Sequence, residues 1–401
     1  MPTFEYKAYD KEGNPKSGIV EAANEEAAAA LLRDMNLTVV SLEMKVKPVW
    51  EITIPALRVV SQKEIVVFSR QLATMIKSGL TLVNALRILQ EQTENKEFKK
   101  ILDKIATDVE AGTNLSRAMS KHPKVFNKVY VTMIRSGEAS GKLDEVFLRL
   151  ADQLEKNYGM IAKIRSAMAY PAFILVALVA VAILMIVMVI PQLKSLFEES
   201  GIQLPWTTRL LLAVSNFFRD YWYIALLIIV GVVFGFRFWI STKEGRKSWD
   251  KIKLKIPVFG NLARKIYMAR FTRTLGTLIA GGLPILEALE ITSEAIGNTL
   301  YQEGVEEAAK KVETGASLGT TLRKNKNFPV MVAQMIEVGE KTGNVEEILS
   351  RLADFFEAEV DAMTKTLSSL LEPILMVIMG IGVAIIVASV IMPIYGLVQA
   401  F

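Results

Sequence analysis

Long apolar runs occur at three places along the chain, at residues 171–191, 221–240 and 373–394. The first has no polar side chain between Ala172 and Ile190, and a helix of that length rises roughly 28 Å, close to the hydrocarbon thickness of a bilayer. The second run is short unless it continues beyond Arg237, whose long side chain can reach the headgroups. The pattern predicts three transmembrane helices.

Apolar residues at helical spacing fill the two regions before the first and third runs, residues 61–170 and 241–372. We predict one cytosolic domain of about six helices in each region. Ser61 and Glu64 have the spacing of a capping box, which marks the start of the first domain. Its helices are expected to end at glycines that can adopt the left-handed C-cap conformation, namely Gly79, Gly112 and Gly137.

The second region repeats the first. Phe-Ser-Arg at 68–70 returns as Phe-Thr-Arg at 271–273, and Arg-Leu-Ala-Asp at 149–152 returns at 351–354. The spacing shifts by one residue between Leu318 and Met335, which indicates a deletion in a loop. A duplication explains these matches and predicts one shared fold for both copies.

The motif Gly-Glu-x-x-Gly also occurs in both copies, just before each long helix that leads to a membrane run. One interpretation is a turn between helices, with the glutamate near a helix N-terminus, where negative charge is favoured. The other is a surface loop that docks a cytosolic partner. The residues concerned are Gly137, Glu138, Gly141, Gly339, Glu340 and Gly343.

The first 44 residues predict a small α+β module, followed by a linker at 45–60 that contains Pro48 and Pro55. A strand begins at Phe4, a second follows a turn at 13–15, and a third covers residues 38–40. Asn24 is the expected N-cap of the intervening helix. Leu31 and Leu32 are expected on the inner face of that helix.

Charge predicts the topology. The net charge is +5, and basic residues gather directly after the second run, as on a cytoplasmic flank. We therefore expect residues 192–220 to form an external loop and residues 395–401 an external tail. The N-terminus is expected to be cytoplasmic, because no apolar run opens the chain as a signal peptide would. The positive flank predicts contact with anionic lipid and requires no nucleic acid.

Small residues and prolines punctuate the apolar runs. The small residues stand at four-residue intervals and permit close helix packing, either among the chain's own spans or against another copy or another protein's transmembrane helix. They are Gly231, Gly235, Gly380, Ala384 and Ala388. Pro171 and Pro373 stand where cytosolic helix becomes membrane helix, and they predict either hinges or simple entry points.

Composition argues against an enzyme. Cysteine is absent, and the single histidine, His122, gives little scope for a metal site. No phosphate-binding P-loop motif occurs, so any ATP-driven step is expected from another subunit. Acidic clusters that include Asp144 and Glu145 fit a solvated helix face better than catalysis. We therefore predict no catalytic residue, metal or cofactor.

These motifs together resemble those of the PilC/GspF family, the inner-membrane platform proteins of type IV pili and type II secretion. The resemblance covers the whole chain: Phe4-x-Tyr6-x-Ala8, both Phe-[Ser/Thr]-Arg and Gly-Glu-x-x-Gly motifs, and the prolines before the first and third runs. It departs in the second copy, where Val345 replaces Leu143.

The resemblance implies an all-α integral membrane protein of the bacterial inner membrane, with two six-helix cytosolic bundles, three transmembrane helices and a small N-terminal module. It implies a non-enzymatic scaffold that self-associates and couples a hexameric assembly ATPase to pilin insertion, beside other inner-membrane subunits. The Gly-Glu-x-x-Gly loops are the hypothetical ATPase side. The alternatives are a type II secretion platform handling pseudopilins, a transporter or channel component, and a signalling receptor.

Overall fold

The computed structural model describes residues 3–9, 11, 15–22, 24–44, 60–185, 188 and 206–398. The chain divides into two compact units, residues 1–59 and 60–401. The linker predicted at 45–60 lies outside the described residues except for Val60, and the predicted turn at 13–15 is described only at Pro15.

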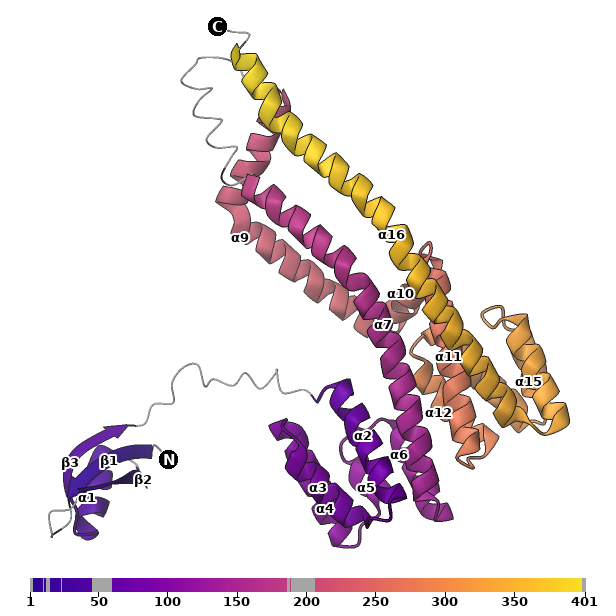
Figure 1. Cartoon of the computed structure of the whole chain (residues 1–401), viewed down its shortest axis with the longest axis horizontal. Coiled ribbons are helices and arrows are strands. Elements are labelled where there is room, and N and C mark those ends of the chain that lie inside the picture. Colours follow the sequence, from indigo (N-terminus) through magenta and orange to yellow (C-terminus); the bar gives the residue numbers. More distant parts are fainter. Residues whose placement is uncertain are drawn as a thin grey trace. The chain divides into compact units, whose positions relative to one another are not determined.

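The N-terminal unit is a three-stranded antiparallel sheet with one helix (Figure 1). Its elements are β1 (Thr3–Tyr9), β2 (Pro15–Glu21), α1 (Glu25–Asp34) and β3 (Thr38–Met44), with strand order β2-β1-β3. The Asn24 side chain accepts a hydrogen bond from the Ala27 amide at 2.8 Å, which confirms it as the N-cap. Leu32 is buried, but Leu31 is 46% exposed. The prediction for Leu31 is wrong because neighbouring helical residues point about 100° apart.

The first helical repeat begins at the predicted capping box. The Ser61 amide donates to Glu64 Oε2 at 2.6 Å, and the Glu64 amide donates to Ser61 Oγ at 3.2 Å. Six helices follow: α2 (Gln62–Lys77), α3 (Leu82–Gln92), α4 (Lys96–Glu110), α5 (Leu115–Ser120), α6 (Lys128–Ser140) and α7 (Leu143–Leu184).

The second repeat has the same order of helices. They are α11 (Phe259–Ala280), α12 (Ile285–Ile296), α13 (Thr299–Glu313), α14 (Leu318–Arg323), α15 (Val330–Thr342) and α16 (Val345–Val398). The helices α5 and α14 have six residues each, and α6 and α15 have thirteen each. The missing residue therefore falls in the loop before α15, which confirms the prediction of a loop deletion.

Both repeats share one hydrophobic core. A single cluster of buried side chains runs from Val60 to Leu367 and includes Phe68 and Phe98 from the first repeat and Phe271 and Phe328 from the second. Helix α7 lies beside α16 and α11 (Figure 1). The two copies are therefore packed into one body.

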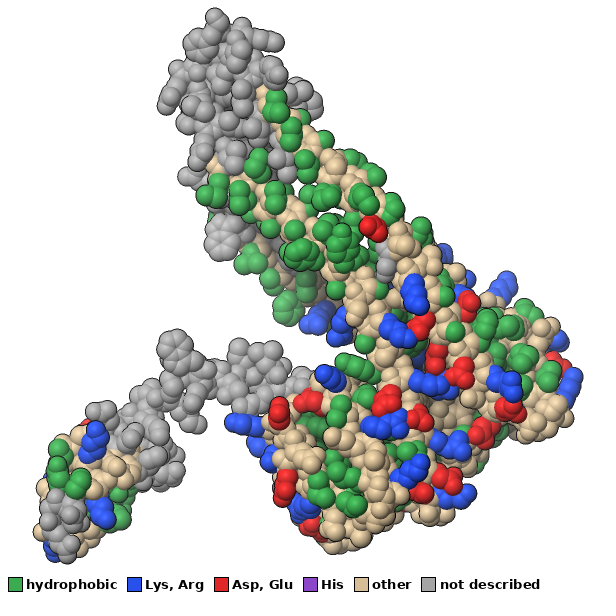
Figure 2. Space-filling view, in the orientation of Figure 1, with side chains coloured by type: hydrophobic (Ala, Val, Ile, Leu, Met, Phe, Trp, Pro, Cys, Tyr) green, Lys and Arg blue, Asp and Glu red, His purple; other side chains and the backbone are tan. Residues whose placement is uncertain are grey.

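Two more helices connect the repeats, α9 (Trp206–Ser241) and α10 (Lys243–Lys255). Among the described residues, two helices are long and apolar enough to cross a membrane, Leu143–Leu184 and Val345–Ala384. The number rises to three if Leu226–Ser241 and Lys243–Lys255, bent by 101°, count as one span. Figure 2 shows hydrophobic side chains along the long helices and charged ones over the bundles.

Candidate functional site

Gly137 and Gly339 lie inside helices and do not end them. Helix α6 continues to Ser140, and its left-handed C-cap is Gly141 with φ of 68°; in the second repeat Gly343 has φ of 74°. The prediction that the helix ends at Gly137 is therefore wrong. Gly137 is glycine for a different reason, because a Cβ there would stand 3.1 Å from the Val146 side chain of α7. It permits α6 and α7 to approach closely.

Glu138 caps the short helix α5. Its carboxylate accepts the backbone N–H of Leu115 at 2.5 Å, the N–H of Ser116 at 3.2 Å and the Ser116 hydroxyl. The first amides of a helix have no partner inside the helix, and the positive end of the helix dipole favours an anion there. The carboxylate thus connects the end of α6 to the start of α5.

Glu340 does the same for α14 with a changed set of donors. It accepts the N–H of Leu318 at 2.6 Å, the N–H of Gly319 at 3.1 Å and the Ser317 hydroxyl at 2.6 Å. Gly319 occupies the position of Ser116, so the hydroxyl now comes from two residues earlier. Each glutamate lies in the last turn of its own helix and caps a helix about twenty residues earlier, not the long helix that follows the motif as the sequence suggested.

Both copies also contain an arginine held by two carboxylates. Arg70 of α2 pairs with Asp152 and, at 2.6 Å, with Glu155 of α7. Arg273 of α11 pairs with Asp354 at 2.5 Å and with Glu357 at 2.8 Å. Each arginine and its aspartate come from the two motifs that the sequence repeats most clearly, Phe-[Ser/Thr]-Arg and Arg-Leu-Ala-Asp, and each glutamate follows three residues after the second motif. Sequence reasoning found both motifs but did not predict that they pair.

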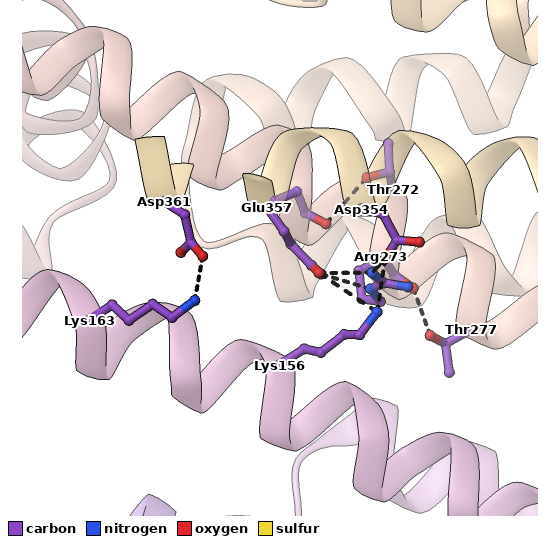
Figure 3. A network of polar contacts seen from close by, with 9 residues as sticks. Lys156, Lys163, Thr272, Arg273, Thr277, Asp354, Glu357 and Asp361 are labelled. Atoms are coloured by element: carbon purple, nitrogen blue, oxygen red, sulfur yellow. Dashed lines mark hydrogen bonds and ion pairs between the residues drawn. The ribbon is translucent and has the colours of Figure 1, made fainter. Parts of the chain in front are cut away.

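The second cluster extends into a seam between the repeats (Figure 3). Lys156 of α7 reaches across to Asp354 at 2.8 Å and Glu357 at 3.8 Å, and Lys163, two turns further along α7, pairs with Asp361. Burial alone would raise the pKa of Asp354, but hydrogen bonds from Lys156 and Arg273 lower it below its ordinary value. The seam therefore holds a charged carboxylate between two cations.

A cavity of about 270 Å³ lies next to this seam, lined mainly by residues of α7 and α11. Three of its lining residues have a buried polar atom with no hydrogen-bond partner among the described residues: Gln153 Oε1, Asn157 Oδ1 and Arg270 Nε. Burial lowers the pKa of Arg270 from its ordinary value. Among the described residues, no group of three or more His, Cys, Asp or Glu could hold a metal ion. The cavity offers polar contacts, and we find no paired acid and base for catalysis there.

The small residues predicted for helix packing face open space. A Cβ added at Gly231, Gly235 or Gly380 meets nothing within 4 Å in the described structure, and Ala384 and Ala388 are exposed. A close approach between α16 and α7 occurs instead at Gly382, where a Cβ would stand 3.0 Å from Leu178 of α7. Packing of these faces against another helix thus stays a prediction.

The two prolines lie within continuous helices. Pro171 is buried in α7, and Pro373 is exposed in α16. A proline removes one helical hydrogen bond, so a bend at either position remains a prediction.

The comparisons with known proteins agree on one family. The model described as "Type II secretion system (T2SS), protein F" matches twice, at residues 68–191 and 271–393, and the N-terminal domain model of the same protein matches residues 1–43.

The relatives carry two kinds of name. A type IV pilus assembly protein PilC of Thermus thermophilus is 42% identical over 99% of this chain and 98% of the relative. The PilC of Myxococcus xanthus is 39% identical over 99% and 95%. Type II secretion system protein F of Xanthomonas campestris is 34% identical over the full length of both. The double match confirms the duplication, and the chain belongs to the type II secretion protein F family, which includes the PilC pilus assembly proteins.

Proposed function

We propose that this chain is the inner-membrane platform of a type IV pilus assembly machine. The observation that carries the proposal is the alignment of essentially the whole chain with a pilus assembly protein at 42% identity. The secretion proteins of Xanthomonas campestris and Vibrio cholerae align over 100% and 98% of this chain, but at 34% and 32% identity. A type II secretion platform is therefore the second candidate.

The architecture supports a scaffold. Two copies of one helical bundle share a core, and each copy ends in a long helix, α7 or α16, whose far part is apolar and exposed. A filament subunit that leaves the membrane needs a partner anchored in the bilayer and open to the cytosol. The proposed placement is three spans at 171–191, 221–240 and 373–394, with the bundles and N-terminus in the cytoplasm and the 192–220 loop and the tail outside.

The proposed partners follow from this placement. The chain has no P-loop motif, so ATP hydrolysis is assigned to a cytosolic hexameric ATPase, and pilins are assigned to the open faces at Gly231, Gly235 and Gly380. These faces could equally seat a second copy of this chain. A transporter or channel gains no support from the relatives that match.

Deletion of the gene in its own host tests the function. We expect loss of surface filaments, counted by electron microscopy, with protein secretion intact and filaments restored by a plasmid copy. Loss of secretion with filaments intact would assign the chain to type II secretion. A deletion strain that keeps both would overturn the proposal.

The docking role of the Gly-Glu-x-x-Gly loop needs a variant that spares the cap. Because Glu138 holds α5 in place, its substitution would damage the fold as well as any docking surface. Asp144 and Glu145 are exposed next to the loop, so the double variant Asp144→Lys, Glu145→Lys is the sharper probe. Capture of the ATPase by the detergent-solubilised variant should fall, whereas Glu313→Lys on α13 should leave it unchanged. Equal capture by both variants would remove this loop from the docking surface.

A further inference from the structure

Helix α10 turns sharply away from the helix before it. The segment Leu226–Ser241 and helix α10 are bent by 101° at Thr242, whose hydroxyl accepts the Gly245 amide at 3.1 Å as an N-cap. If α9 crosses the bilayer, a bend near 90° sets α10 parallel to the membrane surface. Trp249 of α10 packs edge-on against Phe236 of α9 at 5.1 Å between ring centroids, so one side of α10 is directed toward the apolar helix.

One face of α10 is held by the second repeat. Asp250 accepts the Thr299 amide at 2.9 Å and the Thr299 hydroxyl at 2.7 Å, at the start of α13, and Leu254 is buried. Burial alone would raise the pKa of Asp250, but these bonds and Lys253 lower it. The carboxylate is therefore charged at neutral pH, and it sets the rotation of α10.

The opposite face carries an exposed apolar corner, which we define as Ile252, Ile256, Val258 and Phe259. Their exposed fractions are 44, 39, 48 and 39%. Ile252 and Ile256 are one turn apart, and each lies about 200° around the helix from Asp250 or Leu254. The corner is therefore directed away from the protein core, on the side of α10 where Trp249 meets α9.

The backbone at Val258 is strained to form this corner. Val258 has φ of 65° and ψ of −56°, and the Phe259 amide donates to the Pro257 carbonyl at 2.7 Å. This is a γ-turn with positive φ, a rare conformation that is unfavourable for a β-branched residue. Gly260 closes the turn, since a Cβ there would stand 2.4 Å from the Leu254 carbonyl oxygen. The turn leaves the apolar side chain of Val258 about half exposed, so only part of it is buried in the protein.

Basic side chains flank the corner. Helix α10 has six basic residues against Glu244 and Asp250. Lys247 pairs with Glu303 and Lys253 with Asp250, but Lys251 and Lys255 have no carboxylate partner in the part of the chain that the structure describes. These two lie one turn apart beside Ile252 and Ile256. An apolar strip bordered by cations is the composition of a helix that lies in a membrane interface.

We propose that α10 lies in the cytoplasmic interface of the bilayer, with the apolar corner inserted among acyl chains and Lys251 and Lys255 on anionic headgroups. The occupant of this surface is anionic lipid, because positive charge and exposed apolar area coincide there. The inference rests on the proposed span at α9. It adds a second contact that fixes the rotation of the second bundle relative to the membrane.

Single cysteines test the inference, because the chain contains none of its own. Ile252→Cys is labelled with an environment-sensitive fluorophore in the full chain, in vesicles of phosphatidylcholine with phosphatidylglycerol. Val338→Cys on α15, 48% exposed, is the matched aqueous control, and Leu227→Cys on α9, 72% exposed, reports the span. Equal melting temperatures of the unlabelled variants in detergent establish that each is folded.

We expect nitroxide lipids to quench the labels at Ile252 and Leu227, and acrylamide to quench the label at Val338. Neutralising Lys251 and Lys255 with glutamine should weaken insertion of the corner by roughly fivefold for each lysine. Quenching at Leu227 without quenching at Ile252 overturns this inference but keeps the span. If nitroxide lipids quench neither the label at Leu227 nor the label at Ile252, the proposed span is overturned as well. A label at Ile252 shielded from both quenchers would mean that protein covers the corner, which also overturns the inference.

Discussion

The two arginine clusters occupy equivalent positions but differ in what they hold together. Arg70 is 33% exposed, and its partners among the described residues, Asp152 and Glu155, both lie in the first repeat. Arg273 is 15% exposed, and its partner Asp354 also receives Lys156 from the first repeat. The first cluster joins two helices of one bundle, and the second joins the two bundles.

Divergence at single positions accounts for the difference. Lys156 corresponds to Ala358 in the other copy, and Asp361, the partner of Lys163, corresponds to Gly159. In each of these pairs, one residue comes from the first copy and one from the second. With the two copies exchanged, alanine or glycine would stand in place of one charged residue, and the pair could not form. The arginine and its two carboxylates are the same in both copies, whereas each seam pair has one residue that the other copy lacks.

The largest expected effect comes from exchanging the residues beside the two glutamate caps. Gly319→Ser restores the side chain of the first copy, but its Cβ would stand 2.6 Å from the Ala333 carbonyl oxygen. We expect a loss of about 3 kcal/mol of unfolding free energy from overpacking. The reverse change, Ser116→Gly, should cost about 1 kcal/mol for the lost hydroxyl bond. Urea unfolding in mild detergent measures both, and equal losses would contradict the asymmetry.

Removing the capping carboxylates should affect both copies alike. Glu138→Ala and Glu340→Ala each leave two helix amides without an anionic acceptor, and we expect about 2 kcal/mol of destabilisation for each. Glu145→Ala, on an exposed face, is the control and should stay within about 0.5 kcal/mol of the parent. A large effect in only one copy would show that the caps have diverged as the seam has.

The arginine clusters should respond unequally. Arg273→Met removes a mostly buried cation from between two carboxylates, and we expect a loss of about 2 kcal/mol. Arg70→Met removes an equivalent but more exposed cation, and the loss should stay below about 1 kcal/mol. Thermal unfolding of the two variants provides the comparison. A greater loss of stability for Arg70→Met than for Arg273→Met would mean that the cluster in the first bundle contributes more to stability than the one between the bundles.

Acid should weaken the seam. The pKa of Asp354 is lowered in the folded protein, so its charge contributes stability above the ordinary value of 3.8 and loses this contribution as pH falls through the lower folded value. Melting temperatures measured from pH 6 downward should fall less steeply below about pH 4 in Asp354→Asn than in the parent. Glu313→Gln is the matched control on an exposed position. Parallel curves for Asp354→Asn and the parent would exclude a role for this charge.

The smallest effect is expected at the seam lysine itself. Lys156 is 45% exposed, so Lys156→Ala, which installs the residue of the other copy, should cost about 0.5 kcal/mol. The loss should shrink in high salt, because screening weakens exposed pairs. A loss that does not depend on salt would indicate that the methylene chain of Lys156 contributes by packing.

Local signals in the sequence predicted local structure well. The Ser61–Glu64 box, the Asn24 cap and the order of the helices all depend on residues within a few positions of one another, and the position of the deletion came from comparing the two copies. The end of α6 was predicted at Gly137 because a glycine that ends a helix and a glycine that admits a neighbouring helix look the same in a sequence. Only the short distance from Gly137 to Val146 in the folded protein shows which of the two roles this glycine has.

The sequence by itself determined the duplication, the helix order, the apolar runs and the likeness to a known family, since each is a pattern of residue types along the chain. Tertiary structure alone decided that Glu138 and Glu340 cap helices about twenty residues earlier, that Arg273 and Lys156 meet at Asp354, and that Ile252 and Val258 stay exposed. These contacts join residues up to about two hundred positions apart. Their formation depends on how closely helix backbones approach, which a pattern along one chain does not record.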